Sequence, residues 1–190
     1  MSKEYIKEMV RKTLLAESKK TAYDYGCVMV YLKVDSKDWD SIQDVIEDED
    51  LFVGTGDDKD MVARETEPHV TILYGIHGDV PDSDVEPIID EIKRPEIKLK
   101  NVSAFKNEKY DVLKFDIESP YLHTLNDKFK KLPYTSNFPD YHPHCTIAYL
   151  KPNTSEKYIK LLNDKKGITV EPEKIVYSKP NGTKKDYKLK

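Results

Sequence analysis

The heptapeptide Pro68–Tyr74, PHVTILY, is repeated almost unchanged as Pro143–Tyr149, PHCTIAY. Pro, His, Thr, Ile and Tyr are identical in the two copies, and the second begins 75 residues (143 − 68) after the first. Val, Thr, Ile and Tyr favour extended backbone, so each copy predicts a β-strand. The repeat therefore predicts a fold with two related halves.

Side chains alternate between the two faces of a strand, which sorts each copy into a polar and an apolar set. His69 and Thr71 are predicted to share one face, and so are His144 and Thr146. The opposite face is expected to carry the remaining positions of each copy: Val70, Ile72 and Tyr74, and Cys145, Ile147 and Tyr149. Each strand thus offers an imidazole and a hydroxyl together.

Two histidines and two threonines suit displacement at a phosphodiester. Histidine has the side-chain pKa nearest neutrality, so one imidazole can act as a base while the other acts as an acid. Threonine hydroxyls can donate to the oxygens on which charge develops. A lone His-x-Thr is most often structural, but core packing does not require the same polar pair twice. We therefore predict His69, Thr71, His144 and Thr146 as catalytic, with no metal or cofactor and with base and acid unassigned.

The doubled His-x-Thr-x motif resembles the 2H phosphoesterase superfamily, which includes LigT-like enzymes and phage phosphodiesterases that destroy cyclic nucleotide signals. The resemblance implies an α+β, two-lobed fold with mainly antiparallel sheets around a central cleft and with flanking helices. It implies a hydrolase of the anti-CBASS kind, with cyclic di- or trinucleotides as substrates. We expect one such domain over residues 21–190, preceded by a helical extension over residues 1–20.

Composition narrows the class of partner. The 190 residues carry 31 basic and 35 acidic side chains, a formal net charge of −4, which disfavours a protein that coats long nucleic acid. A small nucleotide, a cyclic oligonucleotide or a short RNA remains compatible with this charge. No stretch has the length and apolarity of a membrane span or a signal peptide, so we expect a cytoplasmic protein without a membrane partner. Cys27 and Cys145 fit free thiols in a reducing compartment.

Hydrophobic periodicity and turn residues predict the order of elements. Helices are expected over 3–18, 39–47 (capped by Ser36 or Asp38), 82–93 (capped by Asp82 or Ser83), 120–131 (capped by Ser119) and 155–163. Strands are expected over 25–34, the two motifs, 97–105, 112–117, and a terminal hairpin of 168–174 or 175–178 with 186–189.

Aromatic and charged residues near the expected strand ends are candidates for substrate binding. Flat rings can stack on nucleobases, a lysine can neutralise phosphate, and the resemblance places pocket residues on the terminal hairpin. The candidates are Tyr25, Phe105, Tyr110, Tyr141, Lys151, Glu171 and Glu173.

Three alternatives stay open. An RNA-end enzyme would act on 2′,3′-cyclic phosphates or 2′-5′ linkages with the same residues, although it would favour a more basic surface. A non-catalytic nucleotide-binding module could keep the fold, although binding alone does not need two titrating groups. A metal site could use His142, His144 and His77, although no carboxylate or thiolate pattern accompanies them.

Overall fold

The computed structural model describes residues 25–54, 63–136, 138, 140–163 and 168–190. Its centre is a seven-stranded sheet of order β3-β4-β5-β2-β1-β6-β7, in which every neighbouring pair is antiparallel. The strands are β1 (Tyr25–Val34), β2 (His69–His77), β3 (Lys98–Lys106), β4 (Asp111–Glu118), β5 (His144–Leu150), β6 (Val170–Ser178) and β7 (Lys184–Lys188). The predicted α+β class and the antiparallel pairing are confirmed.

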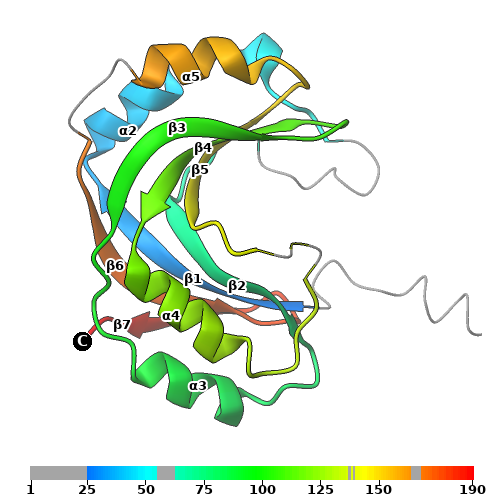
Figure 1. Cartoon of the computed structure of the whole chain (residues 1–190), viewed down its shortest axis with the longest axis vertical. Coiled ribbons are helices and arrows are strands. Elements are labelled where there is room, and N and C mark those ends of the chain that lie inside the picture. The colour runs from blue at the N-terminus through cyan, green and yellow to red at the C-terminus, as the bar shows by residue number, and fades with distance from the viewer. Residues whose placement is uncertain (1–24, 55–62, 137, 139, 164–167) are drawn as a thin grey trace, which may run out of the picture.

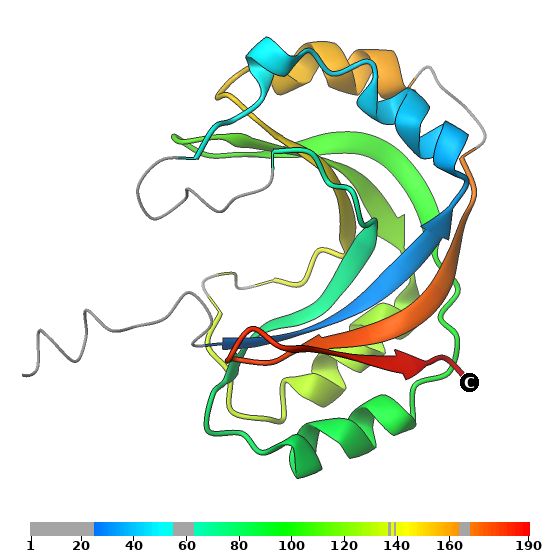
Figure 2. The same ribbon diagram turned by 180° about the vertical axis from the view of Figure 1, so that it is seen from behind.

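Helices cover the outer face of this curved sheet. They are α2 (Ser36–Gln43), α3 (Asp82–Asp90), α4 (Pro120–Phe129) and α5 (Ser155–Asn163), with the short 3₁₀ helix η1 (Asp48–Asp50). The sheet bends into an open arch, with α2 and α5 outside one end and α3 and α4 outside the other (Figure 1). Seen from behind, β1, β6 and β7 run side by side along one edge (Figure 2). The inner, concave face carries no helix of the described chain.

The core lies between the helices and the convex face of the sheet. Val28 and Val30 of β1, Val70 and Ile72 of β2 and Ile147 of β5 are fully buried there. They belong to one cluster with helix residues that include Trp39, Ile42, Leu122, Leu125, Phe129, Tyr158 and Leu162. Burial of these apolar side chains fixes which face of each strand points outward, and it leaves the other face of each motif strand to the concave side.

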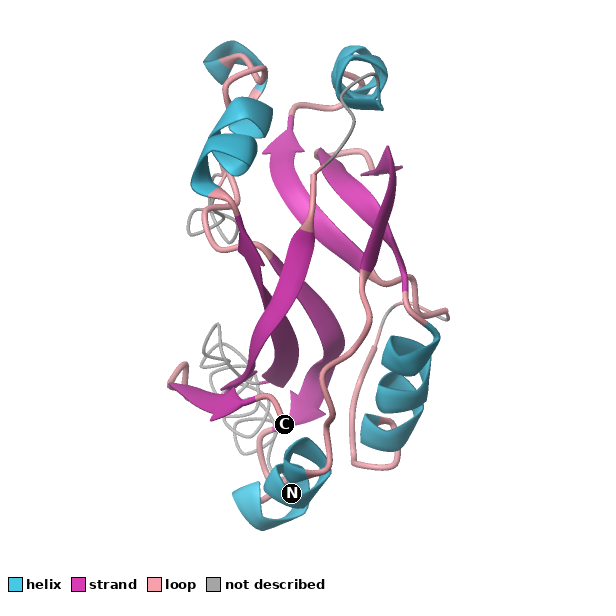
Figure 3. Cartoon of the chain, turned by 90° about the vertical axis from the view of Figure 1, so that its left-hand side faces the viewer, coloured by secondary structure: helices cyan, strands magenta, loops and turns pink. Residues whose placement is uncertain are grey.

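The chain folds as two similar units, whose strands are interleaved in the sheet. Each unit runs strand, helix, strand, helix, strand: β1-α2-β2-α3-β3 and then β4-α4-β5-α5-β6. The third strand of each unit pairs with the first strand of the other, because β3 lies beside β4 and β6 lies beside β1. The helix pairs therefore occupy the two ends of the molecule, with the strands crossing between them (Figure 3). The two lobes are the two halves of one continuous sheet, β3-β4-β5 and β2-β1-β6-β7, and each contains strands of both units.

The halves meet at the motif strands. Val70 and Cys145 are paired between β2 and β5, and no other residue pair is registered between these two strands in the described chain. Beyond this pair, β5 is hydrogen-bonded to the segment that precedes β2. Glu65 N donates to Ile147 O at 3.0 Å, and Arg64 forms an isolated antiparallel β-bridge with Ala148. The single shared pair brings both copies of the repeated heptapeptide to the middle of the sheet.

Several predicted boundaries need correction. Asp35, rather than Ser36 or Asp38, caps α2, because its carboxylate accepts from Lys37 N at 2.9 Å and from Asp38 N. The N-cap of α3 is Pro81, which offers no side-chain cap, and the helix ends three residues earlier than expected. The cap Ser119 and Pro120 in the first turn of α4 are as predicted.

Two further predictions concern the terminal hairpin and the N-terminal extension. The two alternatives for the hairpin strand are one continuous strand, β6. The helical extension predicted for residues 1–20 lies outside the described residues. No described helix has both the length and the apolarity needed to cross a membrane.

Gly75 is required where β2 meets the loop before the second motif. It has φ of +98°, and a Cβ at this position would lie 1.9 Å from the carbonyl oxygen of Thr135. The close approach permits Thr135 N to donate to Gly75 O at 2.9 Å and His77 N to donate to Pro133 O at 3.0 Å. The loop that leads to His144 is thereby fastened to the end of the strand that carries His69.

Gly75→Ala should therefore lower the free energy of unfolding by about 2–5 kcal/mol, because backbone atoms must move as well as φ. Gly182→Ala is the matched control, since Gly182 also has a positive φ (82°) but lies in the β6–β7 turn. That change should cost only about 1 kcal/mol. Urea unfolding of both variants measures the difference, and equal losses would show that the collision with Thr135 is unimportant.

Candidate active site

The four motif side chains surround the junction of the two halves on its concave face. His69 and Thr71 flank Val70, and His144 and Thr146 flank Cys145. Because Val70 and Cys145 are paired and face the core, the four flanking side chains share the opposite face. His69 is close enough for its charge to act on His144. The structure thus brings together all four residues that the repeat predicted.

The carbonyls of two turns fix the tautomer of both histidines. Nδ1 of His69 lies 2.8 Å from the carbonyl oxygen of Glu67, and Nδ1 of His144 lies 2.7 Å from that of His142. A carbonyl can only accept, so each Nδ1 carries a hydrogen and donates it. Each Nε2 is then the nitrogen that can take up or release a proton. The two imidazoles are oriented identically, as expected from the repeat.

The surroundings of the two histidines differ in charge, and the His144 side is positive. Lys114 on β4 is directly opposite Thr146, and the residue is only 4% exposed. It donates to Ser103 Oγ at 2.8 Å and to the Asp116 carboxylate, and it lies 4.1 Å from the centre of the Phe105 ring. That ring meets His144 edge-on, with the ring centres 5.0 Å apart.

A carboxylate lies beside His69. A carboxylate oxygen of Glu65 lies 3.7 Å from His69 Nδ1, which forms an ion pair whenever the imidazole is protonated. The other carboxylate oxygen of Glu65 accepts from Glu67 N at 2.8 Å. Tyr31 of β1 stacks on His69 at 5.5 Å between ring centres, and its hydroxyl accepts from Lys184 Nζ at 3.0 Å. Glu65 therefore places a carboxylate beside His69, where His144 has an ammonium.

The pKa of His144 is lowered from its ordinary value. Burial is the largest cause, and the positive charges of Lys114 and His69 lower the pKa further. The carbonyl of His142 and the carboxylate of Asp116 act in the opposite direction but do not cancel the effect. The lowered pKa favours the neutral form of His144, in which Nε2 is unprotonated.

Each threonine is held by a neighbour on the concave face. The Thr71 side chain is hydrogen-bonded to Cys27, and the Thr146 side chain is hydrogen-bonded to Tyr149. Burial raises the pKa of the Cys27 thiol to about 12, so the thiol stays protonated. The backbone carbonyl of Thr71 also accepts from the Tyr141 hydroxyl at 2.9 Å. These contacts reduce the freedom of the two hydroxyls.

The tyrosines of the heptapeptide lie on the concave face, which corrects the predicted alternation. In β2 the register shifts so that Met29 pairs with Thr71 and Cys27 pairs with Tyr74, leaving Ile72 as an extra residue. In β5 Lys114 pairs with Thr146 and Val112 pairs with Tyr149, again with one extra residue. A bulge of this kind resets the alternation, so both tyrosines share the face of His and Thr. Tyr74 is 57% exposed there.

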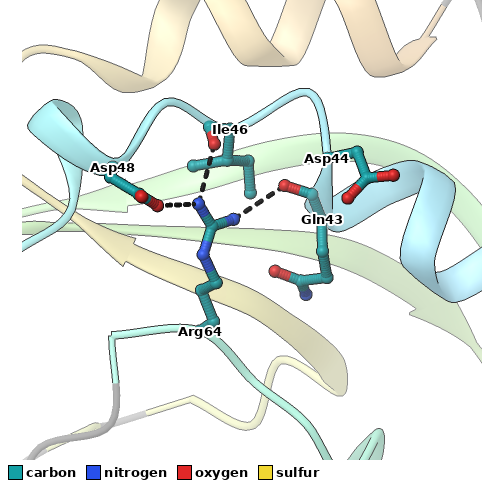
Figure 4. A pocket seen from close by; sticks show the side chains of 5 residues that line it. All are labelled: Gln43, Asp44, Ile46, Asp48 and Arg64. Carbon is teal, nitrogen blue, oxygen red and sulfur yellow. Dashed lines mark hydrogen bonds and ion pairs between the residues drawn. The ribbon is translucent and has the colours of Figure 1, made fainter.

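A pocket beside α2 is structural in character. It is lined by Gln43, Asp44, Ile46, Asp48 and Arg64. The Arg64 guanidinium donates to the carbonyls of Gln43 at 2.7 Å and Ile46 at 2.8 Å and pairs with the Asp48 carboxylate (Figure 4). These contacts tie the segment before β2 to the loop after α2, which helps to position Glu65 and His69.

The predicted substrate-binding residues fall into two groups. Tyr25, Phe105 and Tyr110 lie on or beside the concave face, and Phe105 touches His144. The Tyr141 hydroxyl donates to the Thr71 carbonyl. Lys151 lies beyond the end of β5 and donates to the carbonyl of Glu49. Glu171 and Glu173 are exposed on β6, and no described contact joins either carboxylate to the four motif side chains. Of the seven, Phe105 touches the His144 ring and Tyr141 touches the backbone of Thr71, whereas no described contact joins the other five to the four motif residues.

Glu65, Lys114, Asp116 and Tyr31 were not foreseen. Lys114 and Asp116 did carry a signal, because they alternate with Leu113, Phe115 and Ile117 in a strand that was predicted. Their position beside the second motif depends on long-range pairing, which the sequence does not give. In the part of the chain that the structure describes, no group of three His, Cys, Asp or Glu side chains could hold a metal ion, and His142, His144 and His77 form no such group.

Fold and site together define a phosphodiesterase of the 2H type, with a duplicated unit and one His-x-Thr pair in each half. The model of the anti-CBASS protein Acb1 family matches residues 30–178, so the chain belongs to the Acb1 family. The match includes both heptapeptides. No individual curated protein matches the sequence significantly.

Solved structures that share the fold include two of Usb1. Usb1 of Kluyveromyces marxianus superposes with a TM-score of 0.56 at 12% identity, over 87% of this chain and 98% of the other. The structure of the same protein with uridine monophosphate gives a TM-score of 0.54 at 13% identity, over 88% and 99%. At this identity the likeness establishes the common architecture.

Lys114→Met should raise the pKa of His144, because a positive neighbour disappears and the Asp116 carboxylate loses its partner. Lys184→Met is the matched control: it removes an ammonium from the Tyr31 side and should leave the pKa of His144 unchanged. NMR titration of the imidazole resonances measures both. A folded Lys114→Met protein whose His144 titrates as in the wild type would contradict the assigned charge effect.

Proposed function

We propose that the protein cleaves nucleotide phosphodiesters without a metal, with His144 as the general base and His69 as the general acid. The observation that carries this proposal is the pair of Nδ1–carbonyl contacts, which leave both Nε2 atoms for proton transfer. The unequal charges around the two rings then divide the roles. Thr71 and Thr146 are proposed to donate to the non-bridging oxygens of the phosphate.

The proposed substrate is a cyclic di- or trinucleotide messenger. Membership of a family described as anti-CBASS and the net charge of −4 support a small nucleotide over long nucleic acid. The likeness to Usb1, which was solved with uridine monophosphate, supports RNA-end processing as the second candidate. The two candidates share the His and Thr chemistry and differ in what surrounds the scissile phosphate.

The reaction on a 3′-5′ linkage with a free 2′-hydroxyl would run in line. His144 Nε2 takes the proton of the 2′-hydroxyl, and the 2′-oxygen forms a bond to phosphorus. The bond between phosphorus and the 5′-oxygen breaks, and protonated His69 gives its Nε2 proton to that oxygen. The products are a 2′,3′-cyclic phosphate and a 5′-hydroxyl. On a 2′,3′-cyclic substrate, water takes the place of the nucleophile.

His69→Ala and His144→Ala should each lower kcat on the order of 10²–10⁴-fold, because each removes one proton-transfer group. The double variant should lose far less than the product of the two, since the groups act in one step. His123→Ala, an exposed histidine on α4, is the matched control and should keep its activity.

The measurement uses a panel of cyclic dinucleotides, cyclic trinucleotides and 2′,3′-cyclic mononucleotides in EDTA, with products resolved by mass. Activity that is lost in EDTA and restored by a divalent ion would replace the proposed mechanism with a metal-dependent one. A folded His69 or His144 variant with near-normal turnover would remove that residue from the chemical step.

Replacement of the 2′-hydroxyl by hydrogen should abolish cleavage of a cyclic oligonucleotide but preserve binding, because the internal nucleophile is gone. Product analysis and calorimetric titration of the same deoxy ring test the two halves of this statement. Equal cleavage of the deoxy ring would mean that water attacks directly. Turnover of 2′,3′-cyclic ends alone would favour the RNA-end candidate.

A further inference from the structure

The bulge of each motif strand removes one residue from the regular ladder of the sheet. In β2 the extra residue is Ile72, directly after Thr71, and in β5 it is Ile147, directly after Thr146. Both isoleucines are fully buried. The extra residue of a bulge has no partner on the neighbouring strand, so its buried carbonyl needs a donor from elsewhere. The source of that donor helps to fix the backbone beside each threonine.

A side-chain amide from a helix supplies this donor in both strands. Nδ2 of Asn126, on α4, donates to the Ile72 carbonyl at 2.7 Å. Nε2 of Gln43, the last residue of α2, donates to the Ile147 carbonyl at 3.0 Å and to the Glu65 carbonyl at 3.2 Å. Gln43 therefore holds both the bulge of β5 and the segment that carries the carboxylate beside His69.

The two contacts are reciprocal between the two units of the chain. Helix α2 belongs to the unit of β2 but holds β5, and α4 belongs to the unit of β5 but holds β2. Each helix thus anchors the motif strand of the other unit, one residue after its threonine. The sequences of α2 and α4 are otherwise unlike. The same contact at the same position of both motif strands points to a role connected with the His-x-Thr pairs.

Packing of the core alone does not account for these amides. Asn126 is only 3% exposed and shares the buried face of α4 with Leu122, Leu125 and Phe129. The Oε1 atom of Gln43 is buried and accepts no hydrogen bond within the described part of the chain. Burial of a polar atom without a partner is unfavourable, so the contact that accounts for Gln43 is the one its nitrogen makes with the strand.

We propose that Asn126 and Gln43 are positioning residues, which hold the hydroxyls of Thr71 and Thr146 where charge develops on the phosphate. This inference rests on the proposed role of the threonines in phosphodiester cleavage. Both amides come from helices on the convex side, so they act on the backbone that follows each threonine and not on the substrate. A displacement of ~1 Å can slow a reaction on the order of 10²-fold, so the anchoring of this backbone affects the chemical step.

Asn126→Leu and Gln43→Met keep the approximate size of each side chain and remove the donor. Each should lower kcat roughly 5- to 100-fold with little change in KM, because the misplaced hydroxyl serves the transition state. Asn163→Leu is the matched control. Nδ2 of Asn163, on α5, donates to the Val102 carbonyl at 2.9 Å beside the register shift of β3, a strand without motif residues. This variant should keep the kcat of the wild type.

Combination with threonine variants separates positioning from a general loss of structure. In a Thr71→Val background, Asn126→Leu should change kcat little further, whereas Gln43→Met should keep its full effect. In a Thr146→Val background the two amide variants should exchange these behaviours. Losses that multiply in all four combinations would show that the amides act through overall stability, and would overturn the inference.

NMR of the threonine methyl groups tests the same contacts without a substrate. Asn126→Leu should shift the methyl resonance of Thr71 and leave that of Thr146 in place, and Gln43→Met should do the reverse. Unshifted resonances in the folded variants would overturn the inference. If Asn126→Leu does not fold, Gln43→Met decides alone, since Gln43 lies half-buried at the end of α2. If the wild type cleaves no nucleotide while the methyl groups respond as expected, the proposed function falls and the placement of the hydroxyls by the amides stands.

Discussion

The pairing of Val70 with Cys145 is the contact on which the arrangement of the molecule depends. It is the point where the two halves of the sheet, β3-β4-β5 and β2-β1-β6-β7, join, and it places the polar residues of both heptapeptides on one face. Burial of the two paired side chains sets the orientation of their neighbours, because a slip by one residue would turn His and Thr into the core. Core packing on the convex side therefore positions the chemistry on the concave side.

The two copies of the motif differ in the charged side chains that lie beside their histidines. The backbone contacts of the two histidines are the same, but a buried ammonium accompanies His144 and a carboxylate accompanies His69. Two equivalent imidazoles would share one pKa and could not hold opposite protonation states at one pH with any preference. The buried Lys114 ammonium lowers the pKa of His144 and so removes this equivalence. The asymmetry comes from residues outside the repeat, so the repeat supplies the common geometry and single side chains supply the difference in charge.

What the sequence predicted and what it missed follow from the range of the interactions. The motif strands, the strand Tyr25–Val34 and the helix that begins after Ser119 depend on local preferences, and all were predicted from residues close in the chain. The cap Asp35 was missed because neighbouring polar residues compete for the same position. Lys114 and Glu65 depend on pairing between distant segments. The faces of Tyr74 and Tyr149 depend on bulges, which the regular alternation of an ideal strand does not contain.

Each repeated residue of the heptapeptide has a defined place in its strand. The carbonyls of Pro68 and Pro143 accept from Leu32 N at 2.8 Å and Ile117 N at 3.1 Å, which sets the register of each motif strand with its neighbour. The next residue is the histidine, the third repeated residue is the threonine, and the isoleucine is buried at the bulge. The bulge then returns the final tyrosine to the same face. Of the five repeated residues, the proline sets the strand register, the isoleucine is buried, and the bulge brings the tyrosine to the face of the histidine and threonine.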